Sequence, residues 1–133
     1  MDYTSLQSDN SAKKKKILIV EDNIESQLIF KVYLRQKYSI DIAATAEDGI
    51  QFLKNNEFDL ILLDINLPGR LNGIDVLNEI RLNMKLKDLP VIVITAYALK
   101  GDREKFLSIG ANNFIPKPVM KETLIEEIGK YLN

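Results

Sequence analysis

Residues 60–69 read LILLDINLPG, an apolar run that ends in an aspartate and a turn. A run that is apolar at every position is typical of a parallel strand covered by helices on both faces. Two more runs have the same character, ILIV at 17–20 and VIVI at 91–94. These three runs predict the centre of a parallel sheet.

Two shorter runs complete the set. Residues 39–44, SIDIAA, alternate as an edge strand does, and residues 113–115 read NFI. Segments with helical spacing of apolar residues separate the runs. Five strand–helix repeats predict an α/β fold, a (βα)5 doubly wound parallel sheet. The usual solution at this length is the flavodoxin-like strand order 2-1-3-4-5.

The segments between the strands carry apolar residues at helical intervals. Ile24, Leu28 and Val32 recur every four residues, which is the period of one helix face. The segment 98–109 is the weakest predicted helix, because it has few apolar residues and contains Gly101.

Composition limits the function further. The 133 residues form one domain's worth of chain, with no cysteine and no histidine, which excludes thiolate metal sites and catalysis by the chain's own imidazole. Residues 1–13 are polar and predict a disordered tail, and residues 14–133 form the folded domain. The basic run 13–16 joins that tail, so we expect no nucleic-acid partner. No apolar run is long enough for a membrane span or a signal peptide, so we expect a cytoplasmic protein without membrane contact.

Polar residues follow the predicted strands where each one ends. Glu21 and Asp22 follow the first strand, Asp64 the third, Thr95 ends the fourth, and Lys117 follows the fifth. Because parallel strands end at the same edge of a sheet, these five side chains should meet there, at the switch point of the strand order.

This set of residues has a specific chemistry. Clustered carboxylates need a cation, and oxygen ligands without His or Cys favour Mg²⁺. The carboxylate of Asp64 could attack phosphorus to form an acyl phosphate. Lys117 and Thr95 could then stabilise charge on the phosphoryl oxygens.

At these residues the sequence resembles the response-regulator receiver domains of two-component phosphorelays. The resemblance extends over residues 16–132. The matching stretches are ILIVEDN (17–23), LILLDINLPG (60–69), NGIDVL (72–77), VIVITAYALKGDREK (91–105) and GANNFIPKP (110–118).

The resemblance implies a role for each site residue. Asp64 would be the phosphoacceptor, and Thr95 and Lys117 would contact the phosphoryl group. Phe114 would be the aromatic switch residue, rotating inward when Thr95 moves, and the bond before Pro118 would be cis. The Mg²⁺ ligands would be Asp22, Asp64 and the main-chain carbonyl of Asn66, with Glu21 acting mostly through water.

The resemblance also implies partners. The phosphodonor would be a histidine kinase or a histidine phosphotransfer protein, and the chain would be no enzyme beyond its own phosphotransfer and autodephosphorylation. We expect a downstream protein to bind the face made by helix 98–109, strand 113–116 and helix 119–132. The chain would be a single-domain regulator or the receiver of a hybrid kinase, with no output segment after it.

One departure concerns the loop NLPGRLNG after Asp64, which is one residue longer before Gly73 than the commonest family pattern. It leaves the shape of the loop open, but not the chemistry.

Three alternatives remain at this point. A haloacid-dehalogenase-type phosphatase would need a second aspartate at position 66, where this chain has Asn66. A flavodoxin-like FMN binder would need a phosphate-binding loop after the first strand, where Glu21 and Asp22 would repel phosphate. A pseudo-receiver would bind partners without phosphorylation and would lack the site residues.

Overall fold

The computed structural model describes residues 14–96 and 98–132. The disordered tail predicted for residues 1–13 lies outside the described residues. The elements follow one another as β1 (Lys16–Val20), α2 (Ile24–Leu34), β2 (Ser39–Ala43), α3 (Ala46–Asn55), β3 (Leu60–Leu63), α4 (Gly73–Leu82), β4 (Val91–Thr95), α5 (Asp102–Ser108), β5 (Asn113–Pro116) and α6 (Lys121–Gly129).

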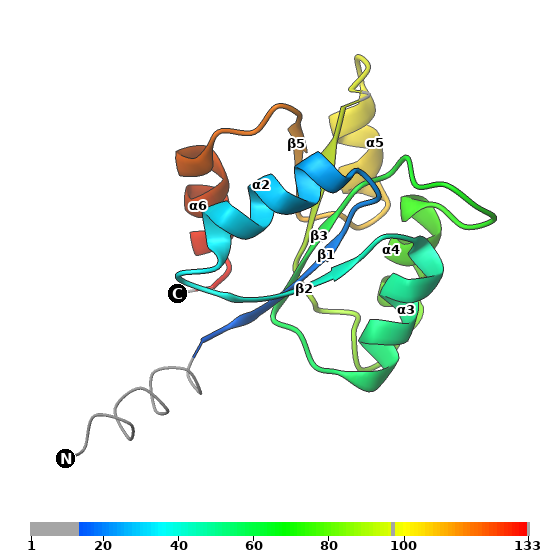
Figure 1. Cartoon of the computed structure of the whole chain (residues 1–133). Helices are drawn as coiled ribbons and strands as arrows, with labels where there is room; N and C mark the ends of the chain where they lie inside the picture. Colours follow the sequence, from blue (N-terminus) through cyan, green and yellow to red (C-terminus); the bar gives the residue numbers. More distant parts are fainter. Residues whose placement is uncertain (1–13, 97, 133) are drawn as a thin grey trace.

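The strands form a single parallel sheet in the order β2-β1-β3-β4-β5, which confirms the predicted fold (Figure 1). Strands β1, β3 and β4 lie at its centre, and their apolar runs are almost completely buried. The sheet is therefore covered on both faces, as continuous apolar strands require.

Two apolar clusters lie on the two faces of the sheet, because alternate side chains of a strand point to opposite faces. Leu18 and Val20 of β1 belong to the cluster that contains the buried side chains of α3, α4 and α5. Ile17 and Ile19 belong to the cluster that contains those of α2 and α6. Figure 1 shows α2 beside α6 on one side of the sheet, with α3 and α4 on the other.

Side-chain caps mark the start of α3 and of α4. Thr45 accepts a hydrogen bond from the Asp48 amide at the start of α3. Asn72 and Asp75 form a reciprocal capping box at the start of α4. Helix α5 is shorter than the predicted segment 98–109, because it begins at Asp102. Gly101, whose φ is 89°, therefore precedes the helix instead of lying inside it.

Helix α2 confirms the predicted helix, and the row of residues that marked it is exposed. Ile24, Leu28 and Val32 do lie on a helix, but they are 69%, 58% and 56% exposed. The face that α2 buries is instead the one with Phe30 and Leu34. The four-residue spacing thus identified the helix, but the apolar row that it marks is not the row that the fold buries.

None of the helices in residues 14–96 and 98–132 combines the length and the apolar character that a membrane span requires.

Candidate functional site

The three acidic residues come together at the carboxyl edge of the sheet. Sheet-type hydrogen bonds continue past the strand ends, from the Glu21 amide to the Ala43 carbonyl (2.9 Å) and from the Asp64 amide to the Val20 carbonyl (3.0 Å). They place Glu21, Asp22 and Asp64 so that one carboxylate oxygen from each lies within 4.8 Å of the others. Asp22 is exposed, whereas Glu21 and Asp64 are buried.

Lys117 reaches the same cluster from the end of β5. Its ammonium nitrogen lies 2.5 Å from Glu21 Oε1 and 3.5 Å from Asp64 Oδ2. The Lys117 amide donates to the Thr95 carbonyl (2.9 Å), and its peptide bond to Pro118 is cis, as the resemblance implied. Because the ammonium lies closer to Glu21 than to Asp64, its main ion pair in this structure is with Glu21.

The carboxyl group of Glu21 has an unusual environment for a charge. Its burial raises its pKa above the ordinary value, and the negative charge of Asp64 adds to the rise. Hydrogen bonds from Lys117 Nζ and from the Asn23 amide oppose this rise, because they stabilise the ionised form. The site therefore contains a buried carboxyl group whose ionised form is stabilised by neighbouring donors.

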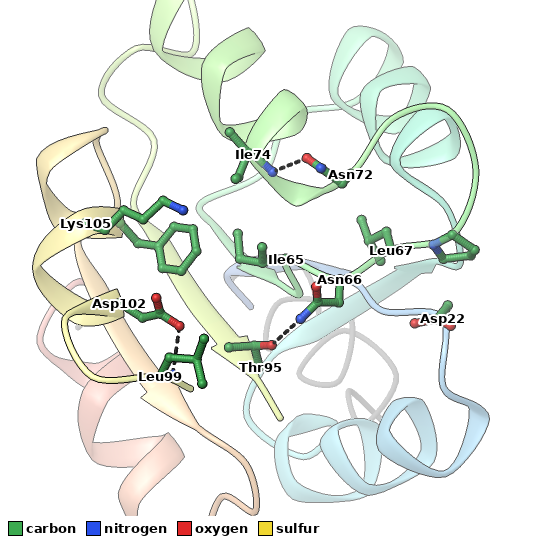
Figure 2. Close-up of a pocket in the computed structure, with 12 residues that line it drawn as sticks. Asp22, Ile65, Asn66, Leu67, Asn72, Ile74, Thr95, Leu99, Asp102 and Lys105 are labelled. Atoms are coloured by element: carbon green, nitrogen blue, oxygen red, sulfur yellow. Dashed lines mark hydrogen bonds between the residues drawn. The ribbon is translucent and has the colours of Figure 1, made fainter. Parts of the chain in front are cut away.

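Asn66 connects the phosphoacceptor candidate to the end of β4. Its main-chain N–H donates to Asp64 Oδ1 (3.1 Å), and its side-chain Nδ2 donates to Thr95 Oγ1 (3.2 Å). Figure 2 shows this amide pointing at the Thr95 hydroxyl along one wall of an open pocket of about 550 Å³ that Asp22 also lines. The side-chain contact of Asn66 was not predicted, because only its carbonyl featured in the resemblance.

The loop after Asp64 keeps α4 close in spite of its extra residue. The Gly73 amide donates to the Ile65 carbonyl (3.0 Å). A Cβ atom at Gly73 would lie 2.2 Å from the Asp64 carbonyl oxygen and 2.6 Å from Ile65 Cα, distances that no side chain can have. Gly73 thus packs directly against the main chain of Asp64.

A second contact was also missed from the sequence. Gln27 on α2 donates from Nε2 to the Glu21 carbonyl (2.6 Å) and so supports the loop between β1 and α2. A glutamine on an exposed-looking helix has no sequence pattern that would reveal such a contact.

Phe114 lies apart from the acidic cluster. Its ring is 7% exposed and stacks on Phe106 of α5, with ring centres 5.6 Å apart and an angle of 10° between the planes. Arg103 ties the same helix to β5 by donating to Asn113 Oδ1 and to the Phe114 carbonyl. The inward rotation expected of Phe114 would need an outward starting position, and in this structure the ring is already inside.

The donor set suits a hard divalent cation. The side chains that converge offer carboxylate oxygens, one of them on an exposed residue that a hydrated ion can reach. Mg²⁺ prefers such oxygen ligands and keeps part of its water shell. Glu21, Asp22 and Asp64 therefore fit the ion that the resemblance implied.

Comparison with known proteins decides the family. Residues 17–129 match the family model of the response regulator receiver domain. The chain belongs to the response-regulator receiver family. Receivers are signalling domains of two-component systems, found in response regulators and in hybrid kinases. Membership in the receiver family favours a phosphoacceptor domain over the haloacid-dehalogenase-type phosphatase and the flavodoxin-like FMN binder.

Curated relatives of this receiver fall into two groups. It is 40% identical over 116 residues to the autoinducer 2 sensor kinase/phosphatase LuxQ of Vibrio vulnificus, covering 85% of this chain but 13% of that protein. It is 38% identical over 121 residues to the chemotaxis protein CheY-3 of Vibrio cholerae, covering 89% of this chain and 92% of that one. The receiver thus spans a small part of a large kinase and nearly all of a single-domain protein.

Solved structures agree with the fold. The response regulator receiver domain protein from Methanospirillum hungatei is 33% identical, with a TM-score of 0.80 over 89% of this chain and 93% of that one. The receiver domain of sensor histidine kinase PA1611 from Pseudomonas aeruginosa is 32% identical, with a TM-score of 0.81 over 89% and 97%. That receiver was crystallised with a magnesium ion coordinated in its active site cleft.

Proposed function

We propose that this receiver accepts a phosphoryl group on Asp64 from a phosphohistidine of a histidine kinase or a histidine phosphotransfer protein. The observation that carries the proposal is the arrangement of one buried aspartate between two carboxylates and an ammonium. Asp64 Oδ2 lies 3.5 Å from Lys117 Nζ, and Glu21 and Asp22 lie beside it.

In the transfer, an oxygen of the Asp64 carboxylate forms a bond to phosphorus while the bond from phosphorus to the donor's imidazole nitrogen breaks. The electron pair of that bond remains on the imidazole nitrogen, so no proton has to leave the aspartate. The Lys117 ammonium neutralises charge on one phosphoryl oxygen, and the Thr95 hydroxyl donates to another.

A divalent cation belongs to this proposal. Glu21, Asp22, Asp64 and the carbonyl of Asn66 would hold Mg²⁺, which when bound supplies positive charge to a phosphoryl oxygen. The acidic residues lose their mutual repulsion when the ion binds. Lys117, whose ammonium lies 3.5 Å from Asp64 Oδ2, would contact the phosphoryl group.

The phosphohistidine must lie outside residues 1–133, since this sequence contains no histidine. Helix α2 begins two residues after Asp22 and presents Ile24, Leu28 and Val32 to solvent. A row of exposed apolar side chains beside the phosphoacceptor is a surface that a partner can bury. We assign this exposed side of α2 to the phosphodonor.

This assignment separates protein donors from small ones. The substitutions Leu28→Ser and Val32→Ser should slow phosphotransfer from a phosphorylated kinase or phosphotransfer protein roughly tenfold or more, because each removes buried apolar area. Phosphorylation by acetyl phosphate should keep its wild-type rate. Equal slowing with both donors would show that the substitutions damage the site instead of the docking surface.

For the downstream partner we propose the face made by α5, β5 and α6. Arg103 and the Phe106–Phe114 stack couple α5 to β5, so a displacement of Thr95 on the neighbouring strand can change this face. Amide spectra with and without beryllofluoride, which mimics the phosphoryl group, test this route. Shifts confined to the acidic cluster would contradict it.

The test of the proposed function itself is chemical. Incubation with acetyl phosphate and Mg²⁺, followed by mass spectrometry of peptides, should map one base-labile adduct to Asp64. The variant Asp64→Asn should lose the adduct, whereas Asp59→Asn, a substitution at the opposite end of β3, should retain it. Full labelling of Asp64→Asn, or no labelling of the wild-type protein, would refute phosphorylation at this residue and favour the pseudo-receiver alternative.

A further inference from the structure

Asn66 lies between the two residues that must act together on a phosphoryl group. Its main-chain N–H holds Asp64 Oδ1, and its side-chain Nδ2 donates to Thr95 Oγ1 at 3.2 Å. Asp64 follows β3 and Thr95 ends β4, so the Asn66 side chain crosses between neighbouring strands (Figure 2). Thr95 is 1% exposed, and its hydroxyl therefore has few places to turn.

We propose that the side-chain amide of Asn66 is a positioning group that holds the Thr95 hydroxyl in its resting rotamer and thereby opposes switching. The inference rests on the proposed function, because it concerns how readily Thr95 can turn to a phosphoryl group on Asp64.

The physical argument starts from the hydroxyl. A threonine hydroxyl has one proton to donate, and its oxygen moves together with the methyl group between three staggered rotamers. The bond from Asn66 favours the rotamer in which Oγ1 faces that amide. A phosphoryl oxygen accepts only, so it favours the rotamer in which the hydroxyl donates toward Asp64. Any stabilisation of the resting rotamer is lost when Thr95 turns, and binding of the phosphoryl group is weakened by that amount.

The expected size follows from a single neutral hydrogen bond. Removal of the Asn66 amide should tighten beryllofluoride binding about threefold to tenfold at saturating Mg²⁺, which corresponds to the net value of one such bond. Both Asn66→Ala and Asn66→Leu remove the donor, and Leu keeps most of the side-chain volume. Because Asn66 is exposed and follows the strand, neither substitution creates a cavity in the core.

A double-mutant cycle isolates the contact. In the background of Thr95→Ala the hydroxyl is absent, so the substitutions at Asn66 should leave beryllofluoride affinity unchanged. Asn55→Ala is the matched control, since it deletes an exposed asparagine at the end of α3 that lies away from the site. It should have no effect in either background.

The Thr95 rotamer gives a second readout that needs no phosphoryl analogue. In the metal-free wild-type protein, three-bond couplings to the Thr95 methyl carbon should report one dominant rotamer, and in Asn66→Ala the population of that rotamer should fall. A purely structural role of Asn66 would change stability without this change in couplings.

The experiment distinguishes this inference from the proposed function. Wild-type protein that does not bind beryllofluoride overturns the proposed function and the inference with it. Wild-type binding with unchanged affinity in both Asn66 variants, or with the same change when Thr95→Ala is present, overturns the inference alone. Tighter binding that depends on the Thr95 hydroxyl supports it.

Discussion

Replacing Asp64 by asparagine should make the metal-free protein more stable and remove most of the stabilisation by Mg²⁺. The substitution keeps the shape of the side chain and its Oδ1, which accepts a hydrogen bond from the main-chain N–H of Asn66. It removes one negative charge from the cluster. The two effects have opposite signs, so together they test whether the carboxylates interact.

The magnitude follows from the distances. Carboxylate oxygens that lie within 4.8 Å of each other repel by at least about 3.5 kcal/mol at an effective dielectric constant of about 20. The Lys117 ammonium, 3.5 Å from Asp64 Oδ2, attracts that oxygen by about 5 kcal/mol on the same scale. Repulsion by the exposed Asp22 is reduced by solvent, so attraction and repulsion nearly cancel.

What remains is the cost of burying the Asp64 carboxylate. A neutral amide does not have this cost, and we expect the free energy of unfolding of metal-free Asp64→Asn to exceed the wild-type value by about 1 kcal/mol. Mg²⁺ at about 100 times its dissociation constant should add about 2.7 kcal/mol to the wild-type protein. At the same ion concentration the variant should gain less than about 1 kcal/mol.

Urea denaturation with and without Mg²⁺ measures both quantities. Glu57→Gln is the control, because Glu57 is exposed and precedes β3 at the other end of the sheet. That variant should respond to Mg²⁺ as the wild-type protein does. Equal stabilisation of Asp64→Asn and wild-type protein by Mg²⁺ would refute the idea that Asp64 is part of the ion's site.

Four further substitutions test the packing, one turn and one helix cap, each by urea denaturation. Gly73→Ala should lower the free energy of unfolding by about 3 kcal/mol and weaken Mg²⁺ binding, because the new Cβ would displace the main chain of Asp64. Gly101 has open space around it, so Gly101→Ala should lower the free energy of unfolding by about 1 kcal/mol through its positive φ alone and leave Mg²⁺ binding unchanged. Tyr38→Phe should stabilise the protein by about 1 kcal/mol, since the Tyr38 hydroxyl is buried without a hydrogen-bond partner among the described residues; a loss of stability would mean that this hydroxyl is bonded. Thr45→Ala should cost about 1 kcal/mol by removing the cap of α3, and an unchanged midpoint would contradict that role.

The sheet and the edge where the site lies were predictable because they follow from patterns that act over the whole chain. Apolar runs such as ILIV and VIVI leave no solvent face, so they must be central strands, and the residues that end parallel strands must share an edge. The polar residues at the ends of those strands therefore indicated where the site lies, without any knowledge of side-chain positions.

The contacts inside the site were not predictable in the same way. Lys117 has a four-carbon side chain that could reach either Glu21 or Asp64, and only the local geometry brings its ammonium to 2.5 Å from Glu21. The side chain of Asn66 had no assigned partner, because a turn asparagine usually bonds its own main chain. Such choices depend on differences of an ångström, which residue spacing does not encode.

Helix α2 shows the same limit on a larger scale. Hydrophobic spacing gives the period of a helix but not the direction in which an apolar row faces, and this helix carries two rows. Phe30 and Leu34 are buried against the sheet, so Leu28 and Val32 cannot be. Aliphatic side chains that are exposed along two turns of a helix gain no stabilisation from their contact with water. Burial against a partner would stabilise the complex by about 1 kcal/mol or more for each of them. Because the row begins beside the acidic cluster, the exposed face that carries it is the one that we expect a phosphodonor to cover.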